Sequence, residues 1–225
     1  MRGFVAGEGY SMGRIVKRAS GWYFQCCVEV KEKKPIKKAK KVVGIDLGIK
    51  NFIVDSDKKQ VDPPRFFNKL LKEIANKQRS LDKKKKGSKR RQKAIQILTR
   101  THEKIGNQRT DFLHKVSRGY ADKYALVAVE KLDVKGMMDS YFSRYIQDSA
   151  WDKFTQLLSY KLKMLGKVYV EVNPSYTTQE CNKCGKIVKK SLSIRTHICD
   201  CGFVVDRDYN AALNIIKKAR AELSV

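Results

Sequence analysis

The chain has 225 residues, of which 49 are lysine or arginine and 23 are aspartate or glutamate, for a formal net charge of +26. This length can bury a real core in one main domain with small attachments. So large a positive charge exceeds what solubility needs and favours a polyanionic partner, with nucleic acid ahead of an acidic membrane surface. Since no apolar run approaches the about 20 residues of a membrane span and no signal peptide is recognisable, we expect no membrane partner and a cytoplasmic location.

The first elements along the chain are predicted to form a β attachment. After a glycine-rich start, apolar and polar residues alternate over residues 14–31, which predicts a half-buried strand with a hairpin turn near Gly21. Residues 31–41 are rich in lysine and read as a charged linker. We therefore expect residues 1–41 to stand apart from the part of the chain that follows.

Two carboxylates interrupt or end the most apolar runs. Residues 42–55 read as a strand, a turn and a second strand, with Asp46 in the first strand and a further short strand expected near residues 59–61. Glu130 lies near the end of another apolar run, residues 125–132, whose continuous hydrophobicity indicates burial on both faces. An unpaired buried carboxylate costs roughly several kcal/mol. Asp46 is therefore either a turn residue satisfied by backbone amides or a member of a group that shares a cation.

Two helical patterns separate these strands. Apolar residues recur at helical spacing over residues 66–81 and again over residues 93–116. The polar break between them predicts a helical hairpin, residues 65–118, with a basic tip. Seven cations so close together would repel one another with nothing opposite, which favours phosphate contact over a merely solvated surface. The predicted nucleic-acid-binding residues are Lys83, Lys84, Lys85, Lys86, Lys89, Arg90 and Arg91.

Residues 134–172 are predicted to contain a loop, a helix and a strand. Residues 134–148 read as a mixed loop whose methionines and aromatic residues serve either stacking or packing. An amphipathic helix is predicted over residues 151–165, and a strand over residues 168–172. The order of elements after the linker therefore predicts a mixed α/β sheet with helices packed on it.

Four cysteines near the end of the sequence have the spacing of a metal site. One pair is spaced Cys-x-x-Cys and the other Cys-x-Cys, with His197 as an alternative ligand. Four thiolates can hold one tetrahedral zinc ion, and such a closed site stabilises a ribbon too small to have its own core. We expect residues 177–204 to form this zinc ribbon. The predicted ligands of one structural Zn²⁺ are Cys181, Cys184, Cys199 and Cys201.

Two more carboxylates, Asp206 and Asp208, follow at the start of an apolar helical pattern over residues 211–221. If one of them meets Asp46 and Glu130, two carboxylates about 4 Å apart repel by about 4 kcal/mol at an effective dielectric of 20. Mg²⁺ or Mn²⁺ would relieve this repulsion, and two such ions can activate water and stabilise the leaving oxygen in phosphodiester cleavage. The acids therefore indicate a metal-dependent nuclease.

Four motifs in fixed order carry a resemblance to a known family. They span residues 44–51, 129–132, 174–185 and 206–212. Together with the basic helical pair between them, they resemble the TnpB family of transposon-encoded RNA-guided DNA endonucleases, which is similar to the compact type V CRISPR effectors. The resemblance covers residues 42–221 and implies a RuvC-type nuclease domain with the RNase H-like fold and a zinc ribbon inserted before its last helix.

The resemblance also implies roles for residues and partners. It implies catalytic, metal-binding acids at Asp46, Glu130 and Asp208, and leaves Asp206 as a capping or supporting group. The implied activity is a magnesium-dependent endodeoxyribonuclease with two Mg²⁺ or Mn²⁺ ions, acting on DNA with a guide RNA. The chain is expected to have four parts. They are a β attachment with its linker (residues 1–41), a RuvC-like core (42–176), a zinc ribbon (177–204) and a last RuvC-like segment (205–225).

One departure from the family bears on function. The family's N-terminal half holds a recognition helical region and a wedge β-barrel, and here only residues 14–31 resemble the last strands of that barrel. We expect either a truncated reading frame or a separate recognition chain that supplies the missing half. The alternative functions are a non-catalytic zinc-ribbon nucleic-acid binder and a stand-alone RuvC-type nuclease. The complete acid set argues against the first, and the ribbon and basic hairpin argue against the second.

Overall fold

The chain folds into two compact units, and a computed structural model describes residues 10–28, 41–137, 143–191 and 193–223. One unit consists of Met1–Glu32 with Phe66–Asp111, and the other of Lys33–Arg65 with Phe112–Val225. The predicted linker, residues 31–41, lies outside the described residues except for its last position. The outer part of the helical hairpin thus belongs to a different unit from the predicted sheet.

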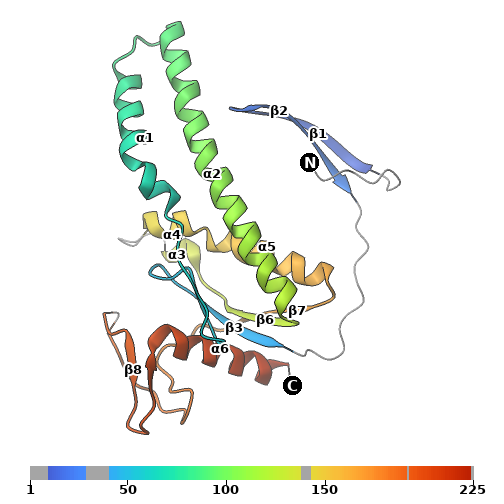
Figure 1. Cartoon of the computed structure of the whole chain (residues 1–225), viewed down its shortest axis with the longest axis vertical. Coiled ribbons are helices and arrows are strands. Elements are labelled where there is room, and N and C mark those ends of the chain that lie inside the picture. The colour runs from blue at the N-terminus through green and yellow to red at the C-terminus, as the bar shows by residue number, and fades with distance from the viewer. Residues whose placement is uncertain (1–9, 29–40, 138–142, 192, 224–225) are drawn as a thin grey trace. The chain divides into compact units, whose positions relative to one another are not determined.

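The first unit contains a β-hairpin and a helical pair. Strands β1 (Tyr10–Arg18) and β2 (Gly21–Val28) pair antiparallel, which confirms the turn predicted near Gly21. Helix α1 (Phe66–Asp82) lies antiparallel beside the start of α2 (Lys89–Lys123) (Figure 1). The turn between β1 and β2 is hydrogen-bonded to α2, because the backbone N–H of Ser20 donates to Glu103 Oε2 over 2.8 Å.

Two predictions for this unit are wrong in detail. The second helix begins at Lys89 rather than Lys93, because Ser88 accepts the backbone N–H of Arg91 on its hydroxyl and thereby caps the helix. Its far end also extends to Lys123 rather than residue 116. Within the described part of the chain, the apolar side of β2 is half-buried only at Cys26 and Val28, whereas Trp22 and Phe24 on the same side are exposed, Phe24 by 73%. A two-stranded hairpin has no second layer of its own to cover that side.

The second unit is built on a five-stranded mixed sheet, which confirms the predicted sheet. Its strands lie in the order β5-β4-β3-β6-β7, with β3, β6 and β7 parallel and β4 and β5 antiparallel. The central strands β3 and β6 are covered on both faces, which explains their largely apolar sequence, whereas the edge strand β7 includes the exposed Glu171. The strands are β3 (Val42–Leu47), β4 (Ile53–Asp55), β5 (Gln60–Val61), β6 (Leu126–Glu130) and β7 (Val168–Val172).

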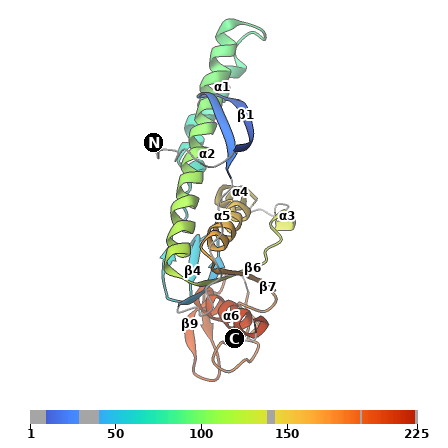
Figure 2. The ribbon, with the colours of Figure 1, turned by 90° about the vertical axis from the view of Figure 1, so that its right-hand side faces the viewer.

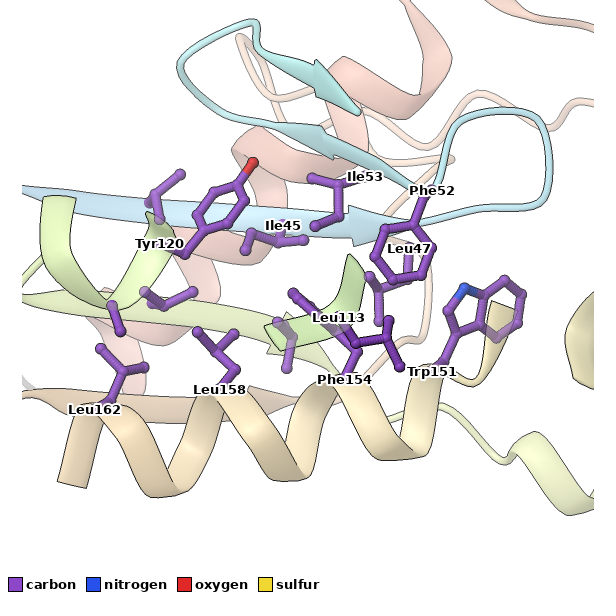
Figure 3. Close-up of a cluster of buried hydrophobic side chains, with 14 of the residues drawn as sticks. Ile45, Leu47, Phe52, Ile53, Leu113, Tyr120, Trp151, Phe154, Leu158 and Leu162 are labelled. Atoms are coloured by element: carbon purple, nitrogen blue, oxygen red, sulfur yellow. The ribbon is translucent and has the colours of Figure 1, made fainter. Parts of the chain in front are cut away.

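Helices cover both faces of this sheet. On one face lie α5 (Trp151–Met164) and the last turns of α2, and on the other lies α6 (Arg207–Glu222) (Figures 1 and 2). The α5 side chains Phe154, Leu158 and Leu162 recur at helical spacing and point into the larger core (Figure 3). The predicted helix at this position is therefore confirmed.

The prediction of a loop over residues 134–148 is wrong. The structure contains two short helices there, α3 (Val134–Met137) and α4 (Ser143–Ser149), while residues 138–142 lie outside the described residues. Ile146 of α4 is buried in the core. Helices this short contain too few buried residues to produce a periodic pattern in the sequence.

Helix α6 packs against the sheet at a glycine. A Cβ atom on Gly44 would lie 2.8 Å from the backbone nitrogen of Ile216 and closer still to the carbonyl oxygen of Ala212. Only glycine therefore allows β3 and α6 to approach this closely. Buried alanines on α6, including Ala212 and Ala219, belong to the same tight interface.

A small ribbon connects β7 to α6. Strands β8 (Thr196–Ile198) and β9 (Val204–Asp206) pair antiparallel, and an isolated bridge joins Glu180 to Ile187. The ribbon runs directly into α6, because β9 ends at the residue before that helix begins. None of the described helices combines the length and apolar character that crossing a membrane requires.

Candidate active site and metal centre

Asp46 and Glu130 are brought together by the register of the parallel strands. Ile45 of β3 is opposite Val129 of β6, so the acids that follow them lie at the neighbouring carboxyl ends of these strands. Both are nearly inaccessible, with 8% and 9% exposure. Burial raises the pKa of Asp46 well above its usual range, and the charges of Glu130 and Asp208 raise it further. Both of the other predicted acids therefore influence the ionisation of Asp46.

Glu130 is held by a residue that the sequence did not single out. The hydroxyl of Thr177 donates to Glu130 Oε1 and lies 3.0 Å from the carbonyl oxygen of Pro174. Burial raises the pKa of Glu130, while the Thr177 hydrogen bond and the charge of Lys218 oppose the rise. Thr177 lies inside the third sequence motif, so its position, though not its partner, was visible in the sequence.

The two acids at the start of α6 have different surroundings. Asp206 caps the helix, because its Oδ1 accepts the backbone N–H groups of Asp208 over 2.9 Å and Tyr209 over 3.1 Å. This confirms the capping role predicted for Asp206. Burial and the charge of Asp206 raise the pKa of Asp208, against the opposing charge of Arg195, whose Nη1 lies 3.9 Å from Asp208 Oδ1.

The acids suit divalent cations by their chemistry. Burial raises the pKa of all three carboxylates despite nearby cations such as Lys218 and Arg195, and carboxylate oxygens are the donors that Mg²⁺ and Mn²⁺ prefer. Among the described residues, however, only the cysteines form a group of three or more potential ligands within 4.8 Å of one another. The arrangement of Asp46, Glu130 and Asp208 is more open than that.

The four predicted cysteine ligands form a closed cluster. Sγ of Cys181 lies 3.7 Å from that of Cys201, and Sγ of Cys184 lies 3.6 Å from that of Cys199. Burial alone would raise the pKa of the Cys181 thiol, but the backbone N–H of Cys184 and the ring of His197 outweigh it and lower that pKa to about 6. The backbone hydrogen bond from Cys201 lowers the pKa of the Cys199 thiol, but burial and the hydrogen bonds of the other thiols outweigh it and raise that pKa to about 12. The cluster therefore favours a thiolate at Cys181, and its four sulfur atoms could hold one metal ion.

The alternative ligand, His197, is not part of this group in the described chain. Its Nδ1 is hydrogen-bonded to Lys190, and its ring packs edge-on against Phe203 inside the ribbon. The turns that bring the cysteines together contain glycines with positive φ, 78° at Gly185 and 79° at Gly202. Glycine adopts this conformation without the strain that a side chain would add.

Two asparagines connect the ribbon to α6 and were missed as contributors. Asn210 accepts the backbone N–H of Asn182 over 3.1 Å and donates to the carbonyl of Glu180 over 2.8 Å. Asn214, one helical turn later, donates to the carbonyls of Thr177 and Glu180 over 2.8 and 2.7 Å. Both asparagines are buried. The ribbon therefore fixes the helix that presents Asp208, although only the spacing of the asparagines was visible in the sequence.

The basic residues of the helical hairpin lie in the first unit and do not all face solvent. Lys84 donates to the carbonyl and hydroxyl oxygens of Ser80, and Arg91 donates to the carbonyls of Leu81 and Lys84, so both close the turn between the helices. The other five side chains are exposed. They are Lys83, Lys85, Lys86, Lys89 and Arg90.

Comparisons with known proteins agree with this architecture. The family model OrfB_IS605, described as "Probable transposase", matches residues 25–141, and the model "Cas12f1-like, TNB domain" matches residues 151–215. A "Putative RNA-guided DNA endonuclease" of Streptomyces pristinaespiralis is 34% identical over 177 residues, or 77% of this chain and 44% of the relative. The "CRISPR-associated endodeoxyribonuclease Cas12f1" of Sulfoacidibacillus thermotolerans is 27% identical over 217 residues, or 88% of this chain and 50% of the relative.

Two solved structures share the fold. The chain named "CRISPR-Cas12f Ternary Complex" matches with a TM-score of 0.61 at 23% identity, over 87% of this chain and 42% of that chain. The chain named "Cas12f1-sgRNA-target DNA complex" matches with a TM-score of 0.57 at 24% identity, over 89% of this chain and 54% of that chain. At these identities the likeness supports the fold alone.

The mixed sheet, with acids at neighbouring strand ends and a cysteine ribbon before its last helix, defines the chain as a RuvC-type member of the RNase H-like folds. The match to the first family model covers more than half of the sequence. The chain belongs to the OrfB_IS605 family, and the TnpB resemblance predicted from its motifs is confirmed. It spans about half the length of the curated relatives it matches.

Proposed function

We infer that the chain is the nuclease core of an RNA-guided DNA endonuclease that hydrolyses phosphodiester bonds with Mg²⁺ or Mn²⁺. The observation that carries this proposal is the register of β3 and β6, which sets Asp46 beside Glu130 at the end of a RuvC-type sheet. The charge of Asp208 acts on the same group, since it raises the pKa of Asp46. Two buried acids and a third, partly buried one are the kind of donor set that two-metal phosphodiester cleavage uses.

In this proposal Asp46, Glu130 and Asp208 hold the divalent ions, which when bound activate a water molecule and stabilise the charge on the scissile phosphate. The chain's own contacts hold the acids in position for this role. Thr177 orients the Glu130 carboxylate, and the Asp206 cap fixes the first turn of α6 from which Asp208 projects. Arg195 limits the repulsion between Asp208 and an approaching phosphate.

The proposed metal of the cysteine cluster is one structural Zn²⁺. Four sulfur donors close a tetrahedral site and leave no position for a substrate, which is the arrangement of structural zinc. The ribbon has little core of its own, so binding of the ion would supply most of its stability. Because the asparagine contacts connect the ribbon to α6, the metal would act on catalysis only through the position of Asp208.

The proposed partners are DNA, a guide RNA and a separate recognition chain. In RNA-guided enzymes base pairing reads the sequence while the protein grips the backbone, which suits a broad basic surface without a base-reading motif. The exposed lysines of the hairpin tip supply such a surface. The exposed apolar side of β2, with Trp22 and Phe24, supports a further protein surface packing there.

Cleavage assays test the proposal directly. The full chain, loaded with zinc, would be incubated with Mn²⁺ or Mg²⁺ and labelled single-stranded DNA, alone, with RNA transcribed from the sequence adjoining its gene, and with any neighbouring recognition chain. We expect cleavage that Asp46→Ala and Glu130→Ala each reduce on the order of 10³-fold, equivalent to about 4 kcal/mol of transition-state stabilisation. Affinity for DNA should stay level or rise, because each substitution removes a negative charge from the path of the phosphates.

The matched control is Asp62→Ala, which removes an exposed carboxylate of the same unit and should leave cleavage unchanged. A wild-type chain that binds RNA and DNA yet cuts under none of these combinations would favour the non-catalytic binder. Cleavage of branched DNA that needs no RNA would favour the stand-alone nuclease. Either result contradicts the proposal.

A further inference from the structure

A pocket opens beside the third acid, on the side away from Glu130. It has a volume of about 270 Å³ and is lined by the β4–β5 hairpin on one side and by β9 with the first turn of α6 on the other. All of its walls belong to the second unit. Tyr209, which directly follows Asp208, forms part of the α6 wall. The lining residues are Val54, Lys58, Gln60, Val205, Asp206 and Tyr209.

The wall opposite Tyr209 is held in a fixed shape. Lys58 has a positive φ of 66°, a conformation that L residues rarely adopt. The fully buried carboxylate of Asp55 holds this turn, because its Oδ1 accepts the backbone N–H groups of Asp57 and Lys59, each over 2.9 Å. Its Oδ2 in turn accepts the hydroxyl of Tyr120 over 2.8 Å. The turn between β4 and β5 accounts for the positive φ, and it fixes the position of Lys58 at the rim of the pocket.

The lining matches the shape and chemistry of a nucleobase. The aromatic ring of Tyr209 and the two valines provide flat and apolar surface, while the Gln60 amide offers a donor and an acceptor to a base edge. The ammonium group of Lys58 lies 5.5 Å from the centre of the Tyr209 ring. Its side chain is exposed, so an entering base can displace it while the charge remains close enough for the adjoining phosphate.

The charges around the acids also favour this side for a polyanion. Arg195, Arg207 and Lys50 all act on Asp208 as positive charges. A second pocket, of about 210 Å³, adjoins Glu130 instead, and its lining includes the carboxylates of Asp152 and Glu171 as well. Its three carboxylates outnumber the one lysine in the lining, Lys131, and so disfavour a phosphate backbone there.

We propose that the pocket at Tyr209 is a base-stacking subsite that seats one nucleotide of a single-stranded nucleic acid next to the acids. Stacking on an aromatic ring tolerates every base, since each has a flat π face, and so suits a strand whose sequence is read elsewhere. Lys58 contacts the phosphate of the seated nucleotide, and Gln60 contacts the base edge. The subsite rests on the proposed nuclease function for its role, and its binding can be measured without cleavage.

The test uses the zinc-loaded full chain with Ca²⁺ in place of Mg²⁺, and a single-stranded oligonucleotide that contains 2-aminopurine, whose fluorescence falls on stacking. Tyr209→Ala should abolish the pocket-dependent quenching and weaken binding about 5- to 150-fold, whereas Tyr209→Phe should retain both. Lys58→Gln should lower the slope of log affinity against log salt by about 0.7, as expected for one phosphate contact on a single strand. Tyr160→Ala, which removes an exposed tyrosine of α5, is the matched control.

A second measurement needs no substitution and so does not depend on how variants fold. An oligonucleotide with 5-iodouracil, irradiated on the wild-type chain, should form its main crosslink in the second unit at Tyr209. Unchanged quenching and affinity in a folded Tyr209→Ala variant, an equal loss in Tyr160→Ala, or crosslinks that avoid the pocket would each overturn the subsite. Cleavage that survives such a result would leave the nuclease proposal standing, and stacking in a chain that never cuts would contradict only the nuclease proposal.

Discussion

The two candidate metal centres are assembled in opposite ways. The cysteine cluster takes all its donors from one short ribbon, and its sulfur atoms gather within 4.8 Å. The acid site takes Asp46 from β3, Glu130 from β6 and Asp208 from α6, and in the described structure these carboxylates do not gather as closely. A site that only stabilises can be closed and local. A site that must admit a substrate is open and depends on the whole sheet.

The two centres also differ in their electrostatics. Local hydrogen-bond donors outweigh burial and lower the pKa of Cys181 to about 6, so this ligand already favours the thiolate that binds metal. Burial and like charges raise the pKa of Asp46, so the sheet opposes the ionised form that a cation needs. The comparison predicts that loss of metal unfolds the ribbon, whereas loss of an acid removes function and can even stabilise the fold.

The largest expected effect is the loss of the ribbon metal. Cys181→Ser should leave less than about half an equivalent of zinc per chain and loosen residues 177–204 before the main sheet, because structural zinc in small peptides supplies about 10–16 kcal/mol. Elemental analysis and hydrogen exchange would measure both outcomes. Cys27→Ser, which changes an exposed cysteine of β2, is the control. Full zinc retention in Cys181→Ser would show that Cys181 is not a zinc ligand.

The next effect separates the two acids at the start of α6. Asp208→Ala should reduce cleavage on the order of 10³-fold, or about 4 kcal/mol, because it removes a proposed metal ligand. Asp206→Ala should keep part of the activity and lower the free energy of unfolding by about 1 kcal/mol, the usual effect of losing a helix cap. Single-turnover cleavage would measure the activity of both variants, and urea unfolding would measure their stability. Equal losses of cleavage in both variants would contradict the distinction between ligand and cap.

A smaller effect concerns how the free energy of unfolding depends on pH. The pKa of Asp46 is higher in the folded state than its unfolded value of about 4. Between these two pKa values the native state binds more protons than the unfolded state, so the free energy of unfolding falls as pH rises. Asp46→Asn should remove this fall and raise the free energy of unfolding at pH 7, by about 1.4 kcal/mol for each pH unit that separates the folded from the unfolded pKa. Below the unfolded pKa the two proteins should not differ. Urea unfolding without added divalent cation measures it, with Asp62→Asn as the control. A destabilised Asp46→Asn at neutral pH would show that the carboxylate is well paired.

The smallest effect tests a surface outside both centres. Lys85→Gln in the exposed hairpin tip should lower the salt slope of DNA binding by about 0.9, the value for one phosphate contact on duplex DNA. Lys84→Gln should change the slope less, because that lysine closes the turn onto Ser80. Neither substitution should alter zinc content or the need for the acids. An unchanged slope for Lys85→Gln would remove that residue from the contact surface.

The difference between a local site and one built from distant segments also explains how much of each site could be predicted from the sequence. Apolar runs revealed β3 and β6, and local spacing revealed the cysteines, because each signal lies within a few neighbouring residues. Nothing in the sequence states that Ile45 lies opposite Val129, nor that Thr177 bonds Glu130, since those contacts depend on how distant segments pair. The acids were therefore identified as candidates one by one, while their relation required the fold.

The close packing at Gly44 has a consequence for judging related copies of such a gene. A methyl group at this position would force α6 away from β3 and so separate Asp208 from Asp46, although every acid and cysteine remained in the sequence. A copy with alanine there would keep every acid and every cysteine, and we expect it to lack the proposed activity. The proposed activity would therefore depend on the absence of a side chain at position 44 as much as on the acids themselves.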